Sequence, residues 1–174
     1  MVPAAVFQLN NVASHSSAFN NLLNCFYMIN WTCKKFNELS PHELYAILQL
    51  RNEVFVVEQN CVFQDADNKD AYCCHLMGWK DGLLAAYTRL VPPGVSYTEM
   101  SIGRVVTSPA ARGGGLGREL MEQSIKRCYN LFGNGAIKIG AQLYLEKFYS
   151  SLGFVQSSEM YLEDGIPHIE MVLS

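Results

Sequence analysis

The sequence lacks three features that would point to other classes of protein: a CxxC pair, an apolar run long enough to cross a membrane, and a run of lysine and arginine. Six cysteines without a CxxC pair argue against a zinc ribbon or a thioredoxin-like site. We expect all of them to be reduced thiols, and therefore a cytoplasmic protein. With a formal net charge of −3 and scattered basic residues, neither nucleic acid nor a membrane is expected as a partner.

The first 33 residues contain no Asp, Glu, Lys or Arg. A secretory signal would begin with basic residues and a mitochondrial one would contain arginines, so neither is indicated. We interpret residues 1–28, which show no hydrophobic period, as an N-terminal extension and residues 29–174 as one domain. Met28 is an attractive alternative start, which would make the preceding residues either an artefact of the assigned start or a disordered tail.

Strand and helix patterns alternate along the rest of the chain. Strands are expected at residues 30–36, 72–79, 83–90, 100–107 and 136–140, and in a last hairpin formed by 154–161 and 167–172. Helices are expected from Ser40, whose capping box uses Glu43, to about residue 56, and at 115–129 and 142–152. This order predicts an α/β fold of the mixed, α+β kind, with antiparallel hairpins at both ends of the sheet.

The segment from Glu58 to Asp70 is expected to be a loop, and it contains a group of aspartates that includes Asp65 and Asp67. An EF-hand calcium loop would also need its glycine and its terminal glutamate, and both are missing. We therefore expect no metal site in the chain.

The most specific pattern is a glycine loop between a β-rich stretch and a helix, Arg112-Gly113-Gly114-Gly115-Leu116-Gly117. Free N–H groups and the helix dipole favour phosphate at such a place, and glycines allow it to approach the backbone. A Walker A loop would continue with Gly-Lys-Ser/Thr, and a GxGxxG loop would need glycine at position 118, which is arginine. The pattern that fits is Arg/Gln-x-x-Gly-x-Gly/Ala.

With its flanking strand and helix, this loop resembles the acetyl-CoA diphosphate loop of the GNAT superfamily, and the chain from Met28 to about Leu173 is similar to the ElaA-type branch. The matching segments are Leu50-Arg51, 54–61, Gln64-Asp65, Asp67, His75, Gly78-Trp79, 102–105, 140–142, Phe148-Tyr149, Gly153-Phe154 and 163–169. The resemblance implies a twisted mixed sheet flanked by helices, with central parallel strands that splay apart to admit acetyl-CoA. It also implies direct attack by a primary amine, from a small molecule or a peptide, in a ternary complex; since GNAT relatives are often dimers, a homodimer is a further implication.

The resemblance also suggests roles for single residues. Besides the glycine loop, contacts with the cofactor are expected from Arg104, Val105, Val106, Gln142 and Tyr149. Tyr149 would protonate the departing thiolate, and His168 would be the base, with His75 as a second candidate. Arg51, Glu58 and His75 are expected to contact the acceptor, although a salt bridge on the first helix is a competing interpretation for Arg51. Gly140-Ala141-Gln142 replaces the asparagine that many GNAT enzymes carry in this region.

Two other functions are compatible with the sequence. A non-catalytic CoA-binding sensor or scaffold would keep the glycine loop without needing Tyr149 or His168, and an interaction protein would need no CoA site. For the enzyme, the acidic groups at Asp65, Asp67 and Glu163-Asp164 would attract a cationic acceptor.

Overall fold

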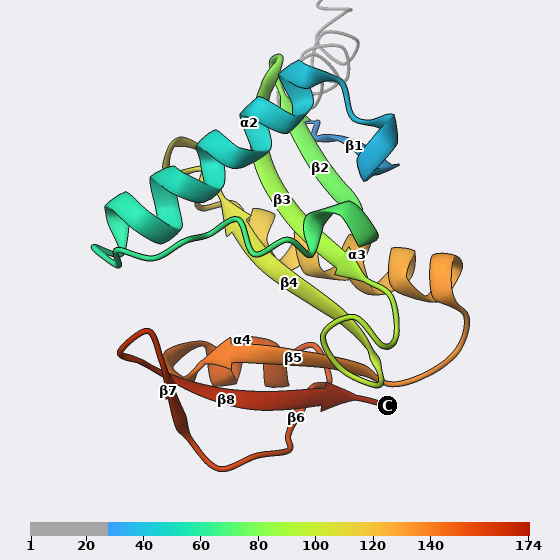
Figure 1. The fold of residues 1–174 in the computed structure, drawn as a ribbon, viewed down its shortest axis with the longest axis vertical. Helices are drawn as coiled ribbons and strands as arrows, with labels where there is room; N and C mark the ends of the chain where they lie inside the picture. Colours follow the sequence, from blue (N-terminus) through green and yellow to red (C-terminus); the bar gives the residue numbers. More distant parts are fainter. Residues whose placement is uncertain (1–27) are drawn as a thin grey trace, which may run out of the picture.

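The computed structural model describes residues 28–174, so the expected extension, residues 1–28, lies outside the described residues except for Met28. The described chain forms a mixed α/β structure, as predicted, with one sheet in the order β1-β2-β3-β4-β5-β8-β6 and β7 paired to β8 (Figure 1). The strands are β1 (Asn30–Lys35), β2 (Cys74–Lys80), β3 (Leu83–Val91), β4 (Met100–Thr107), β5 (Ile137–Gln142), β6 (Val155–Gln156), β7 (Tyr161–Glu163) and β8 (Ile166–Leu173).

Within residues 28–174, three α-helices accompany the sheet: α2 (Pro41–Arg51), α3 (Leu116–Phe132) and α4 (Glu146–Ser150). The predicted capping box starts α2, because Ser40 Oγ accepts a hydrogen bond from the Glu43 N–H at 3.2 Å and the Glu43 carboxylate accepts one from the Ser40 N–H at 2.8 Å. After α2 the chain continues in wider π-helical turns (Asn52–Glu58), and 3₁₀ turns lie at Phe36–Glu38, Asp70–Tyr72, Pro109–Ala111 and Leu143–Leu145. Among residues 28–174, no helix has both the length and the apolar character needed to span a membrane.

The helices cover both faces of the sheet. In Figure 1, α2 crosses in front of β2 and β3, whereas α3 lies behind β4. Beneath α2, Ile47 and Leu50 pack against strand residues such as Met77. On the other face, buried side chains of α3 such as Leu120 pack against Ile139 of β5. Helices therefore pack against both faces of the sheet, and its central strands can position a functional site.

The central parallel strands splay apart, as expected. Only two residue pairs join β4 to β5, Met100 with Ile137 and Ser101 with Lys138. Beyond these pairs the two strands diverge, as Figure 1 shows. On its other side β4 carries a bulge, because Thr88 of β3 faces both Arg104 and Val105. Arg104 has a positive φ of 50°, so the backbone leaves the regular ladder where the strands separate.

The predicted elements 142–152 and 154–161 were wrong in extent. The expected helix 142–152 begins only after Gln142, because Gln142 still pairs with His168 in the sheet, and its α-helical part is α4. The expected strand 154–161 is interrupted after Gln156. At the interruption, the Ser158 hydroxyl accepts the Glu170 N–H at 2.9 Å in place of a backbone carbonyl.

Candidate active site

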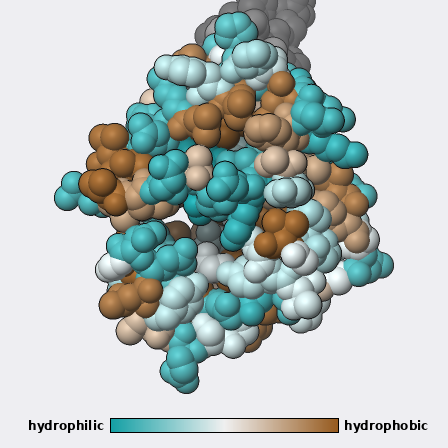
Figure 2. All heavy atoms as spheres, in the orientation of Figure 1, coloured by the Kyte–Doolittle hydropathy of each residue, from teal (hydrophilic) through white to brown (hydrophobic). Residues whose placement is uncertain are grey.

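A cleft of about 730 Å³ lies where β4 and β5 separate. Its walls come from the π-helical turns, the loop after them, β4, β5 and the β7–β8 hairpin. Figure 2 shows the molecule hollowed at this place, between its upper part and the part formed by β5 and β8. The predicted site residues that line the cleft are Glu58, Arg104, Val105, Val106, Arg112, Gln142, Tyr149 and His168.

The glycine loop begins at Arg112, which lines the cleft, whereas residues 113–117 are not among the lining residues. Gly113, Gly114 and Gly115 all have positive φ, a conformation that glycine adopts without strain, and α3 begins directly after them at Leu116. Within the described residues, no acceptor is found for the N–H groups of Gly113, Gly114, Gly115 and Gly117, and the Leu116 N–H has only a long contact of 3.5 Å with the Gly113 carbonyl. A Cβ built on any of the four glycines would meet nothing within 4 Å, so the space above them is open. These residues fit the diphosphate of coenzyme A.

Arg112, the cation of this loop, is paired with Glu58. Its Nη1 and Nη2 donate to the two carboxylate oxygens at 2.6 and 2.8 Å. The hydrogen bond from Arg112 is the main reason that the pKa of Glu58 lies below its ordinary value. The pair joins the glycine loop to the end of the π-helical turns, so both sides of the cleft are connected here.

Tyr149 projects from α4 into the cleft. Its ring is packed edge-on between Phe148, 5.0 Å away between centroids, and Phe154, 6.0 Å away. Burial, with a smaller contribution from Tyr144, raises the pKa of Tyr149 to about 12. No hydrogen-bond partner for its hydroxyl is found in the described part of the chain. Tyr149 therefore presents a protonated hydroxyl that is free to donate to a ligand.

His168 lies on β8, and its tautomer follows from its contacts. Nδ1 is 2.8 Å from the Ile166 carbonyl, which can only accept, so Nδ1 carries the hydrogen. In the neutral ring, Nε2 then holds a lone pair, which is the form a base needs. The ring stacks on Tyr161 at 5.9 Å, which fixes its orientation. His168 therefore lines the cleft, and in its neutral tautomer Nε2 is the ring nitrogen that can accept.

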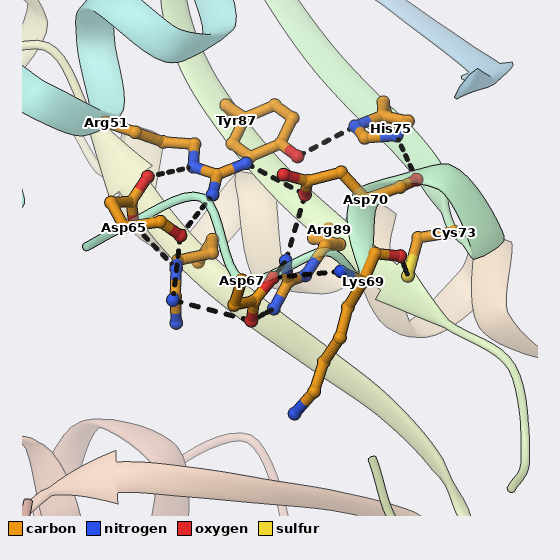
Figure 3. A network of polar contacts seen from close by, with 10 residues as sticks. Arg51, Asp65, Asp67, Lys69, Asp70, Cys73, His75, Tyr87 and Arg89 are labelled. Carbon is orange, nitrogen blue, oxygen red and sulfur yellow. Dashed lines mark hydrogen bonds and ion pairs between the residues drawn. The ribbon is translucent and has the colours of Figure 1, made fainter. Parts of the chain in front are cut away.

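The expectation that Arg51 contacts the acceptor was wrong. Its side chain is completely buried and is not among the residues that line the cleft. Arg51 Nε donates to Asp65 at 2.7 Å, and Nη1 donates to Asp70 at 2.9 Å (Figure 3). The guanidinium also lies over the Tyr87 ring. Arg51 thus has the structural role that was the competing interpretation.

The aspartate group is likewise not a free acidic surface. Asp65 pairs with Arg51 and Arg104, and Asp67 receives two hydrogen bonds from Arg89, at 2.6 and 2.7 Å. The expected attraction of a cationic acceptor by Asp65 and Asp67 was therefore wrong, because arginines already neutralise these carboxylates. The network holds the loop between Glu58 and Cys73 against β3 and β4 (Figure 3).

His75 was also assigned wrongly, both as an acceptor contact and as a second base. It is completely buried and does not line the cleft. Its Nε2 donates to the Asp70 carbonyl at 3.1 Å, which leaves Nδ1 to accept from the Tyr87 hydroxyl at 2.9 Å. Burial lowers the pKa of His75, so the ring stays neutral. Both ring nitrogens serve the fold.

Gln142 reaches the cleft from the end of β5, where its Nε2 donates to Gln59 Oε1 at 3.3 Å. The structure also brings in residues that the sequence did not single out, notably Lys69, Arg89 and Tyr97. They come from separate loops and strands and belong to no local motif. Lys69 lies in the acidic loop between Glu58 and Asp70, where a lysine among aspartates was the one available signal.

Comparisons with known proteins agree with this fold. Residues 46–174 match the family described as the acetyltransferase (GNAT) domain. Protein ElaA of Escherichia coli (strain K12) is 44% identical over 146 residues, which cover 83% of this chain and 95% of that protein. A crystal structure of an acyl-CoA N-acyltransferase from Pseudomonas aeruginosa has 47% identity and a TM-score of 0.79, covering 83% and 99% of the two chains. The crystal structure of E. coli ElaA has 42% identity and a TM-score of 0.80, covering 84% and 100%.

Proposed function

The chain belongs to the GNAT acetyltransferase family, and from this premise we propose that it transfers an acetyl group from acetyl-CoA to a primary amine in a ternary complex. Its family and fold are those of acyl-CoA-dependent acyltransferases. The observation that supports the proposal is that Tyr149 and His168 line one cleft, and that Arg112, which also lines it, leads directly into a loop with free amides.

Backbone groups near the gap between β4 and β5 would hold acetyl-CoA, the acyl donor. The amides of Gly113 to Gly117 bind the diphosphate, helped by the dipole of the 17-residue helix α3. Val105 and Val106 of β4 line the cleft. Beyond Ser101, β4 is no longer paired with β5, so the backbone groups of these valines would bind the pantetheine arm. A backbone N–H near Val105, at the bulge, stabilises the carbonyl oxygen as it gains charge.

Two side chains would move protons. His168 Nε2 takes a proton from the amine nitrogen as the new carbon–nitrogen bond forms. Tyr149 gives a proton to the sulfur as the carbon–sulfur bond breaks. One proton leaves the nitrogen and one reaches the sulfur, so the products are an amide and a free thiol. Because burial raises the pKa of Tyr149 to about 12, the hydroxyl is protonated in the free site and can donate a hydrogen bond to the sulfur as it becomes negative.

An amine screen with acetyl-CoA tests the proposal. Free thiol and acetylated amine should appear together in equal amounts, and a double variant, Tyr149→Phe with His168→Gln, should bind acetyl-CoA but release little thiol. Binding of acetyl-CoA without thiol release for every amine would favour the non-catalytic CoA module instead. Absence of binding would reject both.

Cellular location and assembly are part of the proposal as well. The five cysteines among residues 28–174 are free thiols, and burial is the main cause that raises the pKa of Cys33 and of Cys73 to about 11. Such thiols stay reduced most easily in a reducing compartment, which supports the cytoplasm. The homodimer is a prediction from the family resemblance.

A further inference from the structure

Lys69 lines the cleft from the loop that the arginine–aspartate network holds. Its backbone is fixed: the N–H donates to Asp67 Oδ1 at 3.2 Å, and the carbonyl accepts the Tyr72 N–H at 3.0 Å and the Cys73 thiol at 3.1 Å. The side chain is half-buried and, in Figure 3, extends away from the network. Lys69 is thus a cation that projects into the cleft from a rigid base.

The charge of Lys69 is not compensated by the aspartates around it. Arg51, Arg89 and Arg104 pair with Asp65, Asp67 and Asp70, so three positive charges balance three negative ones. Burial opposes the ionisation of Asp67, but the hydrogen bonds and charge of Arg89 outweigh it and hold the pKa of Asp67 below its ordinary value. Among the described residues, no ion pair is found for Lys69 Nζ.

The facing hairpin carries the opposite charge. Glu163 and Asp164, at the β7–β8 turn, line the same cleft, and in the described part of the chain neither forms an ion pair. His168, the candidate base, follows them on β8. The cleft therefore has a cationic group on the loop wall and anionic groups on the hairpin wall, beside the base.

We propose that the acceptor is an amine that also carries a carboxylate, an amino acid or a peptide end, whose carboxylate binds Lys69 Nζ and whose amine faces His168. This inference rests on the proposed acetyl transfer and narrows its acceptor. Glu163 and Asp164 attract the ammonium form on its way in, and Lys69 holds the other end. An amine without a carboxylate would leave the Lys69 charge without a partner in the cleft.

Matched acceptors test the inference. The acceptors are a series of amino acids in which the distance between amine and carboxylate increases. Each acid is compared with its own carboxamide, and thiol release gives kcat/KM for both. We expect the best acid to exceed its amide at least ten-fold. Lys69→Met should remove this preference by raising KM for the acid, and Lys69→Arg should keep most of it. Lys126→Met, at an exposed lysine of α3, is the control and should change nothing.

The outcomes separate this inference from the proposed function. Equal use of acids and amides by the wild-type protein, or a preference that survives Lys69→Met, would overturn the carboxylate assignment and leave acetyl transfer intact. If Lys69→Met raises KM for acetyl-CoA and leaves the preference for acids unchanged, Lys69 binds acetyl-CoA. This result would also overturn the assignment of Lys69 to the acceptor carboxylate. If no amine is acetylated although acetyl-CoA binds, acetyl transfer fails and this inference fails with it.

Discussion

Arg112 donates two hydrogen bonds to Glu58, at 2.6 and 2.8 Å, and both residues line the cleft. Both side chains are about two-fifths exposed, 41% for Arg112 and 42% for Glu58. The arginine expected to face the cofactor diphosphate is therefore already engaged with a carboxylate. In the proposed function this pair opens, because the diphosphate competes for the same guanidinium.

Glu58→Gln should consequently tighten the binding of acetyl-CoA by a few-fold. The change frees Arg112 to bind the diphosphate of acetyl-CoA, and it removes a negative charge that would repel this diphosphate. Isothermal titration gives the dissociation constant. Glu53→Gln, an exposed change in the same π-helical turns, removes a nearby charge but no hydrogen bond to Arg112, so it should have a smaller effect. Weaker binding in Glu58→Gln would mean that the pair positions Arg112 for the ligand.

Tyr149→Phe should lower kcat about 100-fold or more, the usual contribution of a positioned acid, and change the affinity for acetyl-CoA little. The hydroxyl has no partner among the described residues, so its removal should leave the melting temperature unchanged. Since burial raises the pKa of Tyr149 to about 12, this residue should cause no loss of activity between pH 7 and about pH 10. Tyr45→Phe, on the exposed side of α2, is the matched control. Wild-type turnover in Tyr149→Phe would remove Tyr149 from the mechanism.

His168→Gln should also lower kcat about 100-fold, because the glutamine amide accepts no proton in place of the imidazole. Steady-state kinetics with a saturating amine measure the effect, and His42→Gln, at an exposed position of α2, should be neutral. A variant that keeps its turnover would require a water path or another group as the base.

Asp67→Asn should destabilise the protein at pH 7 by about 3 kcal/mol, because it leaves the buried Arg89 with less compensation. The pKa of Asp67 is lower in the folded state than its unfolded value near ~3.9, so its contribution is present above about pH 4 and lost as the pH falls further. The difference in unfolding free energy between wild type and variant should therefore shrink below about pH 4. Urea unfolding from pH 7 to pH 3 checks this, with Asp81→Asn, in the exposed β2–β3 turn, as control. A difference that stays constant with pH would contradict the assignment.

Local features of the chain were predictable from the sequence because short-range physics sets them. The Asp81-Gly82 and Asp164-Gly165 turns both have two positive φ values, as a tight hairpin between twisted strands requires. The capping box at Ser40 and the glycine loop before α3 were recognisable for the same reason. These elements, together with the family resemblance, were enough to place the cleft.

Long-range pairings were not predictable. Whether Arg51 reaches an acceptor or a buried aspartate depends on how α2 packs on β3, and whether Asp67 is free depends on Arg89, 22 residues away. Sequence spacing carries no information about either contact. Ser158, which lies where the predicted strand 154–161 is interrupted, makes a side-chain hydrogen bond that a hydrophobic pattern does not reveal.

The titration of acetyl-CoA against Gly117→Leu tests the central assignment most directly. Gly117 has no positive φ and no atom within 4 Å of an added Cβ, so leucine should leave the fold intact while covering the loop amides. Lys126→Leu places the same side chain on an exposed position of the same helix. We expect the dissociation constant to rise at least ten-fold in Gly117→Leu and to stay unchanged in Lys126→Leu. A folded Gly117→Leu protein that binds acetyl-CoA as tightly as wild type would contradict the assignment of the diphosphate to this loop.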